Sequence, residues 1–307
     1  MFGVSHPRPQ LPFCLLDNTL AQVPSTVEPT RVTPSLVIDQ TATGLRQGLR
    51  DVWAYRELLY FLTWRDLKVR YRQTALGASW AILQPLTTMV IFSVVFGGLA
   101  NLPSDGVPYP LFSFTALLPW NLFAGAVSRV TASVVGQANL INKVYFPRVL
   151  IPLSGTASAL VDFACSFLIL LAIMGYYAYL PTWRLIALPG LLLLAMGAAL
   201  GIGLWFAALN VRYRDVTYVV PFLVQIWLYA SPVAYSSRLV TDRLGAWAWL
   251  YGLNPLAGIV DGFRWAVLGA GAFPAGLIGT SFVTVVLLLL GGWAYFRRTE
   301  DSFADIV

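Results

Sequence analysis

Six long apolar segments, separated by short polar loops, constrain the fold of this chain more than any other feature. A helix that crosses a bilayer needs about 20 mainly apolar residues, and core helices of water-soluble proteins rarely run that far without charge. Asp162 is the one ionised side chain inside any of the six segments. We therefore expect an all-α integral membrane protein with six transmembrane helices. Its expected spans are residues 76–102, 106–128, 149–180, 185–209, 216–235 and 275–296.

The amount and the placement of charge agree with a membrane location. Charged residues make up 11% of the chain, whereas a soluble domain carries roughly 25%. The net charge of +6 would also suit a nucleic-acid partner, but the cations gather before the first span and after the second, fourth and sixth. Cationic loops stay in the cytoplasm, so we expect both termini there and no nucleic acid as a partner.

The chain divides by composition into a tail, an interfacial helix and a transmembrane domain. Residues 1–50 are rich in proline and contain no long apolar run, so we expect a flexible cytoplasmic tail. Residues 51–72 carry an aromatic stripe at helical spacing with cations beside it, which is typical of an amphipathic helix among lipid headgroups. The alternative is an anchor that only fixes the first span. Residues 73–300 form the transmembrane domain, and residues 301–307 form a cytoplasmic tail.

Motifs for catalysis and metal binding are missing from the sequence. It has no G-x-x-x-x-G-K-[ST] phosphate loop, no G-x-S-x-G elbow and no His/Cys cluster. We therefore expect no enzymatic site, metal or cofactor in the chain itself. Asp162 lies at membrane depth and Arg129 at the cytoplasmic end of the second expected span, and intramembrane ionisable residues are functional candidates by default. A structural role explains them better than catalysis, because Asp162 would hydrogen-bond a neighbouring helix and Arg129 would snorkel to the interface.

Aromatic side chains are frequent in the second and fifth expected spans. Aromatic faces stack on the C–H surfaces of sugars without demanding a fixed hydroxyl pattern, so they would let a glycan slide through a pore. The alternative is the ordinary Trp and Tyr content of membrane interfaces. The candidate lining residues are Phe112, Phe114, Trp120, Phe123, Phe222, Trp227, Tyr229 and Tyr235.

The loop between the fifth and sixth expected spans, residues 236–273, is too apolar to be a solvated loop. We expect it to re-enter the outer leaflet as one or two short helices that break at Asn254-Pro255. Irregular backbone at that depth is tolerated only where protein buries it or where it lines a cavity. A gate at the outer mouth is therefore plausible, with candidate residues Trp249, Tyr251, Asn254, Pro255 and Arg264.

The cytoplasmic stretch of residues 137–148 reads QANLINKVYFPR and is too short to be a domain. A short helix here would dock a cytoplasmic partner, with aromatic side chains as anchors and polar ones as a rim. A plain connector with cytoplasmic charge explains the spacing equally well. The candidate contact residues are Asn139, Asn142, Lys143, Tyr145, Phe146 and Arg148.

An ordered set of stretches resembles the membrane subunits of ABC-2 type polysaccharide exporters, which move O-antigen, capsular polysaccharide or teichoic acid precursors. The order of the stretches is specific, and together they cover roughly residues 51–307. They are RDLKVRYRQTALGASWAILQPL (65–86), LLPWNLF (117–123), NLINKVYFPRVLIPL (139–153), LNVRYRDVTYVVPFLVQIWLYASPVAY (209–235), LNPLAGIVDGFRW (253–265) and FADIV (303–307).

The resemblance implies a homodimer in the bacterial inner membrane, with a continuous pore between the protomers. A separate ABC ATPase dimer would bind ATP and Mg, and residues 137–148 would couple it to the permease. Residues 250–269 would close the periplasmic mouth. The implied function is export of a lipid-linked polysaccharide, with the O-antigen type favoured, from cytoplasm to periplasm. The lipid diphosphate would be attracted by the cations of Arg65, Lys68, Arg70 and Arg72.

Three other functions remain alternatives on the sequence alone. An ABC-2 drug or lipid exporter would prefer small amphiphiles and show a less aromatic pore. A secondary carrier or ion channel would work without an ATPase, although such carriers usually have more ionisable groups in their cores. A non-transporting scaffold of a glycan assembly complex would not depend on pore aromatics.

Overall fold

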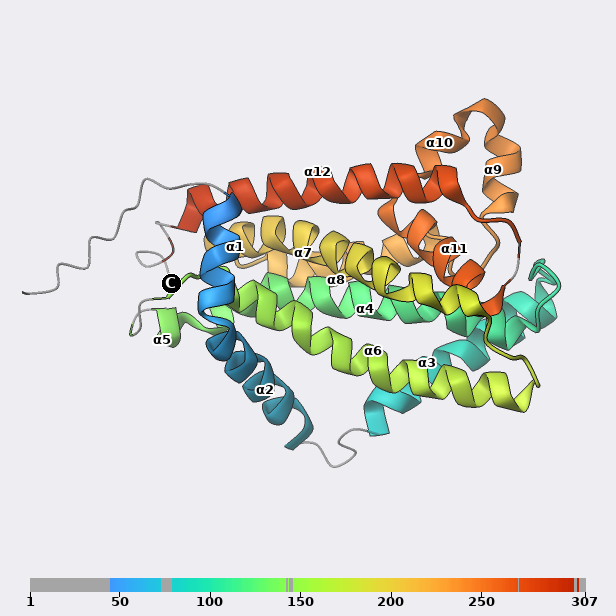
Figure 1. The fold of residues 1–307 in the computed structure, drawn as a ribbon, viewed down its shortest axis with the longest axis horizontal. Coiled ribbons are helices and arrows are strands. Elements are labelled where there is room, and N and C mark those ends of the chain that lie inside the picture. Colours follow the sequence, from blue (N-terminus) through green and yellow to red (C-terminus); the bar gives the residue numbers. More distant parts are fainter. Residues whose placement is uncertain are drawn as a thin grey trace, which may run out of the picture. The chain divides into compact units, whose positions relative to one another are not determined.

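The structure is a computed structural model that describes residues 45–72, 79–141, 143, 146–269, 271–300 and 303. These residues belong to one compact unit, residues 42–307, and their regular elements are all helical (Figure 1). Most of the expected N-terminal tail, residues 1–44, lies outside the described residues. Residues 45–50 are already helical, so regular structure begins before the expected boundary at residue 51.

Five helical segments among the described residues are long and apolar enough to cross a membrane. This agrees with the predicted all-α membrane fold. The first is α3, Ser79–Phe92, with its π-helical continuation Ser93–Leu99. The others are α4, Tyr109–Gly136, then α6, Leu150–Tyr176, then α7, Leu188–Arg212, with the 3-10 turn Trp183–Ala187 before it, and α12, Ala275–Thr299.

The fifth expected span is shorter than the sequence predicted. Helix α8 covers Val216–Ala230, and its 15 residues span about 23 Å at 1.5 Å per residue, less than the ~30 Å of a bilayer core. Ser231 leaves the helix with an extended backbone, φ −102° and ψ 151°. Pro232 explains this ending, because a residue before proline is pushed out of the helical region.

Helix α4 lies at the centre of the bundle, with α3, α6, α7, α8 and α11 packed around it. Close contact between α7 and α12 depends on small residues. A Cβ atom on Gly201 would lie 2.8 Å from the backbone nitrogen of Leu289, and one on Gly292 would lie 2.3 Å from the carbonyl oxygen of Gly201. Because small residues let helix backbones approach, these glycines allow tight packing of transmembrane helices.

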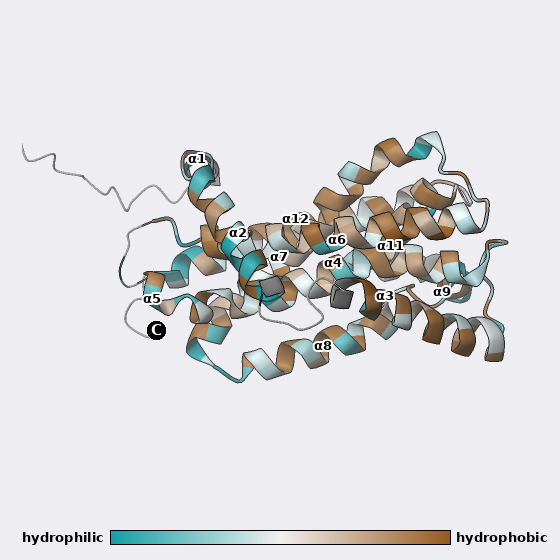
Figure 2. Ribbon diagram, turned by 90° about the horizontal axis from the view of Figure 1, so that it is seen from below, coloured by the Kyte–Doolittle hydropathy of each residue, from teal (hydrophilic) through white to brown (hydrophobic). Residues whose placement is uncertain are grey.

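The expected interfacial helix consists of two helices, α1, Leu45–Ala54, and α2, Arg56–Arg72. Leu62 of α2 is buried, whereas the rings of Trp53, Tyr60 and Trp64 are exposed, as an aromatic stripe among lipid headgroups would be. Figure 2 shows hydrophilic residues gathered on α2, in contrast to the hydrophobic α3. The C-terminal end of α12 lies beside α1, where Arg297 forms a 4.0 Å ion pair with Asp51.

Short helices form the end of the bundle that the sequence places outside. They are α9, Arg238–Leu244, α10, Ala248–Tyr251, and α11, Pro255–Leu268, and they lie beyond or beside the N-terminal half of α12 (Figure 1). The expected break at Asn254-Pro255 is confirmed, because α11 begins at Pro255. At the opposite end, α5, Ala138–Ile141, is the short helix between α4 and α6.

Candidate functional site

Three arginines gather where α2, α4 and α6 meet, and we call Arg65, Arg70 and Arg129 the arginine cluster. Arg70 donates to the carboxylate of Asp162 at 2.8 Å, and Arg129 donates to the same oxygen. Arg65 pairs with the neighbouring Asp66 at 2.8 Å. Two cations from different helices thus converge on the one acid that lies inside a membrane-spanning helix. Tertiary contact, which the sequence does not display, brings Arg129 and Asp162 together.

The arginine cluster lines a cavity of about 260 Å³ between these helices. Three of its lining residues are small, namely Ala132, Gly136 and Gly155. The polar lining groups are Arg65, Asp66, Arg70, Arg129, Ser133, Gln137 and Ser158. Three cations against the carboxylates of Asp66 and Asp162 leave an excess of positive charge, which suits an anionic ligand.

The predicted cationic rim is therefore only partly at this cavity. Arg65 and Arg70 line it, while Lys68 is exposed and is not among the lining residues. The side chain of Arg72 lies outside the described residues. The sequence did not identify Arg129 as a member of this cationic site. Its place near the end of an apolar segment suggested only that its side chain snorkels to the interface. The described residues contain no group of three His, Cys, Asp or Glu side chains that could hold a metal ion.

The segment predicted to couple to a partner has an exposed part and an anchored part. Asn139 and Lys143 are exposed, and α5 holds the first of them. Phe146 is only 5% exposed and packs with Leu62 and Val149 in a cluster of buried apolar residues. It anchors the segment to its own protomer, so it is not free to enter a partner's groove. Asn142 and Tyr145 lie outside the described residues.

Arg148 anchors the same segment to the end of α12. Its backbone nitrogen donates to Oε1 of Glu300 at 3.3 Å, and its guanidinium donates to the carbonyl oxygen of Glu300. Glu300 also pairs with Arg297 at 3.4 Å. A push on α5 would therefore reach α4 and α6 directly and α12 through Arg148.

Four of the predicted pore aromatics are core residues. The exposed fractions of Phe112, Phe114, Trp120 and Phe123 are 1%, 0%, 5% and 0%. They are covered because α4 is surrounded by other helices, and the ring of Phe123 meets Trp227 edge-on at 5.4 Å. Side chains without exposed surface cannot line a passage, so for these four the structure corrects the prediction.

Helix α8 carries exposed aromatic side chains, because Tyr218, Phe222 and Tyr229 are 81%, 63% and 60% exposed. Gln225 is exposed between them. Successive spacings of four, three and four residues place these four side chains on one face of the helix. We call them the α8 stripe. Of its members, Phe222 and Tyr229 were candidates from the sequence, whereas Tyr218 and Gln225 were missed although their helical spacing could have identified them.

Asn254 joins the end of α8 to the start of α11. Its side-chain oxygen accepts from the backbone nitrogen of Leu256 at 3.1 Å, which caps α11, and from Nε1 of Trp227 at 3.0 Å. Its amide nitrogen donates to the carbonyl oxygen of Ala230 and to the hydroxyl of Ser231. The predicted gate residue therefore ties the outer helices to α8.

Arg264 is the other predicted gate residue with a defined set of contacts. It is 5% exposed, and it donates to the carbonyl oxygens of Val233 and Tyr235 at 2.9 and 3.2 Å. Its guanidinium carbon lies 3.6 Å from the ring centre of Phe112. Burial lowers the pKa of Arg264 to about 10, so it stays cationic at neutral pH. Burial also raises the pKa of Asp261, against the opposing effect of Arg264.

The other predicted gate residues differ in exposure. Trp249 is 53% exposed and Pro255 is buried. The hydroxyl of Tyr251 lies 3.2 Å from that of Tyr235, and Tyr235 also donates to the carbonyl oxygen of Tyr229. These contacts link α10 to the turn after α8.

Comparison with known proteins finds relatives along most of the chain. The profile of the ABC-2 type transporter family matches residues 57–268. The O-antigen export system permease protein RfbA of Myxococcus xanthus is 30% identical over 266 residues, which cover 84% of this chain and 98% of the relative. An RfbA of Klebsiella pneumoniae is 29% identical, covering 82% and 95%. The polysialic acid transport protein KpsM of Escherichia coli is 24% identical, covering 78% and 92%.

Proposed function

Because the chain belongs to the ABC-2 type transporter family, we propose that it is the membrane-spanning subunit of a complex that exports a lipid-linked polysaccharide of the O-antigen type. Two relatives that are O-antigen export system permease proteins match 84% and 82% of the chain. Export would run from the cytoplasm to the periplasm across a bacterial inner membrane. The termini would be cytoplasmic, as the placement of the cations predicts.

The α8 stripe is the observation that best supports a glycan as cargo. Lipid offers no hydrogen-bond partner, so tyrosine hydroxyls and a glutamine amide on an exposed membrane helix are costly unless they meet another polar surface. Sugar hydroxyls would provide that surface, and the rings of Tyr218, Phe222 and Tyr229 would contact sugar C–H groups. We propose that two copies of the chain form a homodimer and face each other's α8 stripes across the passage.

A separate ABC ATPase dimer would supply the energy, with ATP and Mg bound by that partner. The exposed Asn139 and Lys143 would contact it, and the anchored Phe146 and Arg148 would carry its movement into α4, α6 and α12. The permease itself would catalyse no reaction. This division of labour between ATPase and permease fits the structure of residues 137–148. Their first part is exposed, and their last part is fixed to α4, α6 and α12.

The arginine cluster would receive the diphosphate of the lipid anchor on the cytoplasmic side. Its cavity of about 260 Å³ opens beside the interfacial helix α2, where a lipid headgroup would approach. Asp162 would hold Arg70 and Arg129 in place until the diphosphate arrives. A diphosphate carries more negative charge than one carboxylate, so it would compete effectively for both arginines.

Transport by the reconstituted complex tests this function. The permease and its ATPase would be placed in vesicles with a lipid-linked glycan, and ATP-driven glycan transfer would be measured for Phe222→Ala and for Phe282→Ala of α12. The two rings are similarly exposed, at 63% and 57%, but only Phe222 belongs to the α8 stripe. We expect slowed transfer for Phe222→Ala alone.

Three results would count against the proposal. Equal transfer rates for both variants would remove the α8 stripe from the passage. Glycan transfer driven by an ion gradient without the ATPase would favour a secondary carrier. ATP-driven movement of small amphiphiles, with no movement of glycan, would favour a drug or lipid exporter.

A further inference from the structure

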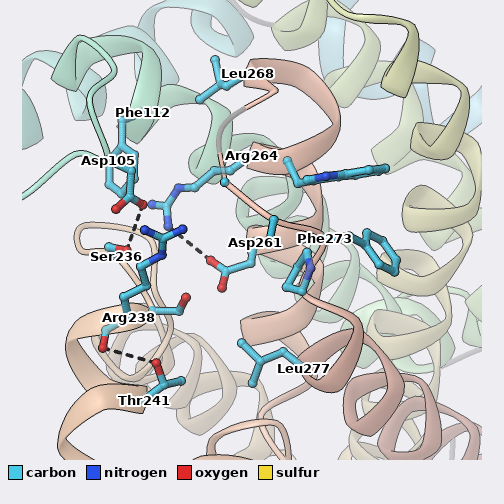
Figure 3. Close-up of a pocket in the computed structure, with 15 residues that line it drawn as sticks. Asp105, Phe112, Ser236, Arg238, Thr241, Asp261, Arg264, Leu268, Phe273 and Leu277 are labelled. Atoms are coloured by element: carbon cyan, nitrogen blue, oxygen red, sulfur yellow. Dashed lines mark hydrogen bonds and ion pairs between the residues drawn. The ribbon is translucent and has the colours of Figure 1, made fainter.

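A second polar cavity lies among α9, α11 and the start of α12, at the end that is outer in the proposed topology (Figure 3). The function proposed above makes no use of it. Its volume is about 260 Å³. Sites for drug-sized ligands typically measure ~300–1,000 Å³, so this cavity would admit one small ring but not several joined rings.

The charges that line this cavity are balanced. Arg238 and Arg264 face Asp105 and Asp261, and Figure 3 shows these side chains converging from α9, from α11 and from the loop before α4. Asp261 lies 3.6 Å from Arg264, and Asp105 accepts a 2.9 Å hydrogen bond from Ser236. Two cations matched by two carboxylates favour neither an anionic nor a cationic ligand. They do offer both donors and acceptors, which suits a neutral ligand rich in hydroxyl groups.

Arg264 carries a donor that the protein leaves unused. Its two terminal nitrogens donate to the backbone at Val233 and Tyr235, whereas its Nε has no acceptor among the described residues. The residue is 95% buried, because only 5% of its surface is exposed. A buried donor without an acceptor is destabilising, so a turn of the guanidinium that brought Nε to a ligand oxygen in the cavity would be favoured.

One aromatic ring at the cavity keeps about half of its surface exposed. Arg264 covers the ring of Phe112 at 3.6 Å, and Arg184 covers the ring of Trp265 at 5.2 Å. Phe273 meets Trp265 edge-on at 4.8 Å and is still 51% exposed. Across the cavity from these rings, Thr241 adds a hydroxyl from α9. The cavity therefore joins an apolar ring with polar groups, as sites for small polar ligands do.

We propose that this cavity binds one neutral sugar ring of the exported glycan, an inference that rests on the proposed export of polysaccharide. Ring hydroxyls would donate to Asp105 or Asp261, and a ring oxygen would accept from Nε of Arg264. The C–H face of the ring would lie on Phe273. A sugar held here would retain the emerging chain at the outer mouth between transport steps.

Binding of simple sugars to the purified full chain in lipid nanodiscs tests this site. The probes are methyl pyranosides of glucose, mannose, galactose and rhamnose, with glucuronic acid and glucose 6-phosphate as anionic counterparts. Saturation-transfer NMR would report binding to the native chain, to Phe273→Ala and to Thr241→Val. Phe282→Ala is the matched control, because Phe273 and Phe282 both line the apolar groove between α7 and α12 but only Phe273 lines the cavity.

We expect at least one neutral pyranoside to bind, with a loss on the order of tenfold, or about 1.4 kcal/mol, in each cavity variant and none in the control. Three results would overturn the proposed site: no saturation transfer to any neutral pyranoside, equal binding in every variant, or tighter binding of the anionic sugars. ATP-driven glycan export by the native chain, reconstituted with its ATPase in vesicles, separates the two proposals. Intact export without pyranoside binding refutes the site alone, and absent export refutes the function.

Discussion

Replacing Asp162 with asparagine tests whether its carboxylate both stabilises the bundle and occupies the arginine cluster. Removing one partner of a buried ion pair costs about 3–5 kcal/mol. The side chain of Asp162 is 26% exposed and that of Arg70 is 38% exposed, so water would solvate part of the freed charge. Asparagine also keeps one acceptor for Arg70 or Arg129. These effects lower the expected loss of unfolding free energy to about 2 kcal/mol.

Two measurements on the purified full chain check this expectation. Reversible unfolding in mixed micelles, followed by tryptophan fluorescence, gives the loss of stability. Binding of a polyprenyl diphosphate to the chain in nanodiscs gives the affinity of the arginine cluster for an anion. This affinity should rise, whereas the stability should fall. Because the competing carboxylate is gone, we expect Asp162→Asn to bind the diphosphate several-fold more tightly than the native chain does.

Asp242→Asn is the matched control, because Asp242 is an exposed acid on α9 at the other end of the bundle. It should change neither the unfolding free energy nor the affinity for the diphosphate. A double-mutant cycle of Asp162→Asn with Arg129→Gln should show a coupling of about 1–3 kcal/mol in stability. Negligible coupling would refute the reasoning that Asp162 pairs with Arg129, and weaker diphosphate binding by Asp162→Asn would refute the reasoning that its carboxylate competes with an anion for the cluster.

Three further substitutions test the packing and the coupling segment. Phe146→Ala should cost about 3 kcal/mol of unfolding free energy because a buried ring is lost, whereas Asn139→Ala should leave stability unchanged and weaken ATPase binding in a pull-down with the partner. Gly201→Val should lower the unfolding free energy by about 1–3 kcal/mol, because the larger side chain overpacks the α7–α12 contact. Gly190→Ala is the control and should melt like the native chain, because a Cβ atom there would meet nothing within 4 Å. Asn254→Ala should cost about 1–2 kcal/mol through the lost cap and should speed proteolysis between α9 and α11; unchanged cleavage would show that Asn254 does not fix the outer helices.

Several features followed from the sequence because they depend on neighbouring residues alone. The lengths of the apolar runs predicted membrane helices, and five of the expected spans correspond to α3 with its π-helical continuation, α4, α6, α7 and α12. The largest difference is at the C-terminal end of α4, which lies at Gly136 and not at residue 128. Proline after Asn254 predicted the break before α11, because proline is favoured in the first helical turn and excluded from helix interiors.

Only the tertiary structure decided which face of each helix is covered. The aromatic residues of α4 and those of α8 look alike in the sequence, yet the first are buried and Tyr218, Phe222 and Tyr229 are exposed. The sequence also placed Arg70, Arg129 and Asp162 far apart, and helix packing made them partners. A residue's tendency to enter the membrane is a property of its own segment, whereas burial and charge pairing depend on the helix that lies beside it.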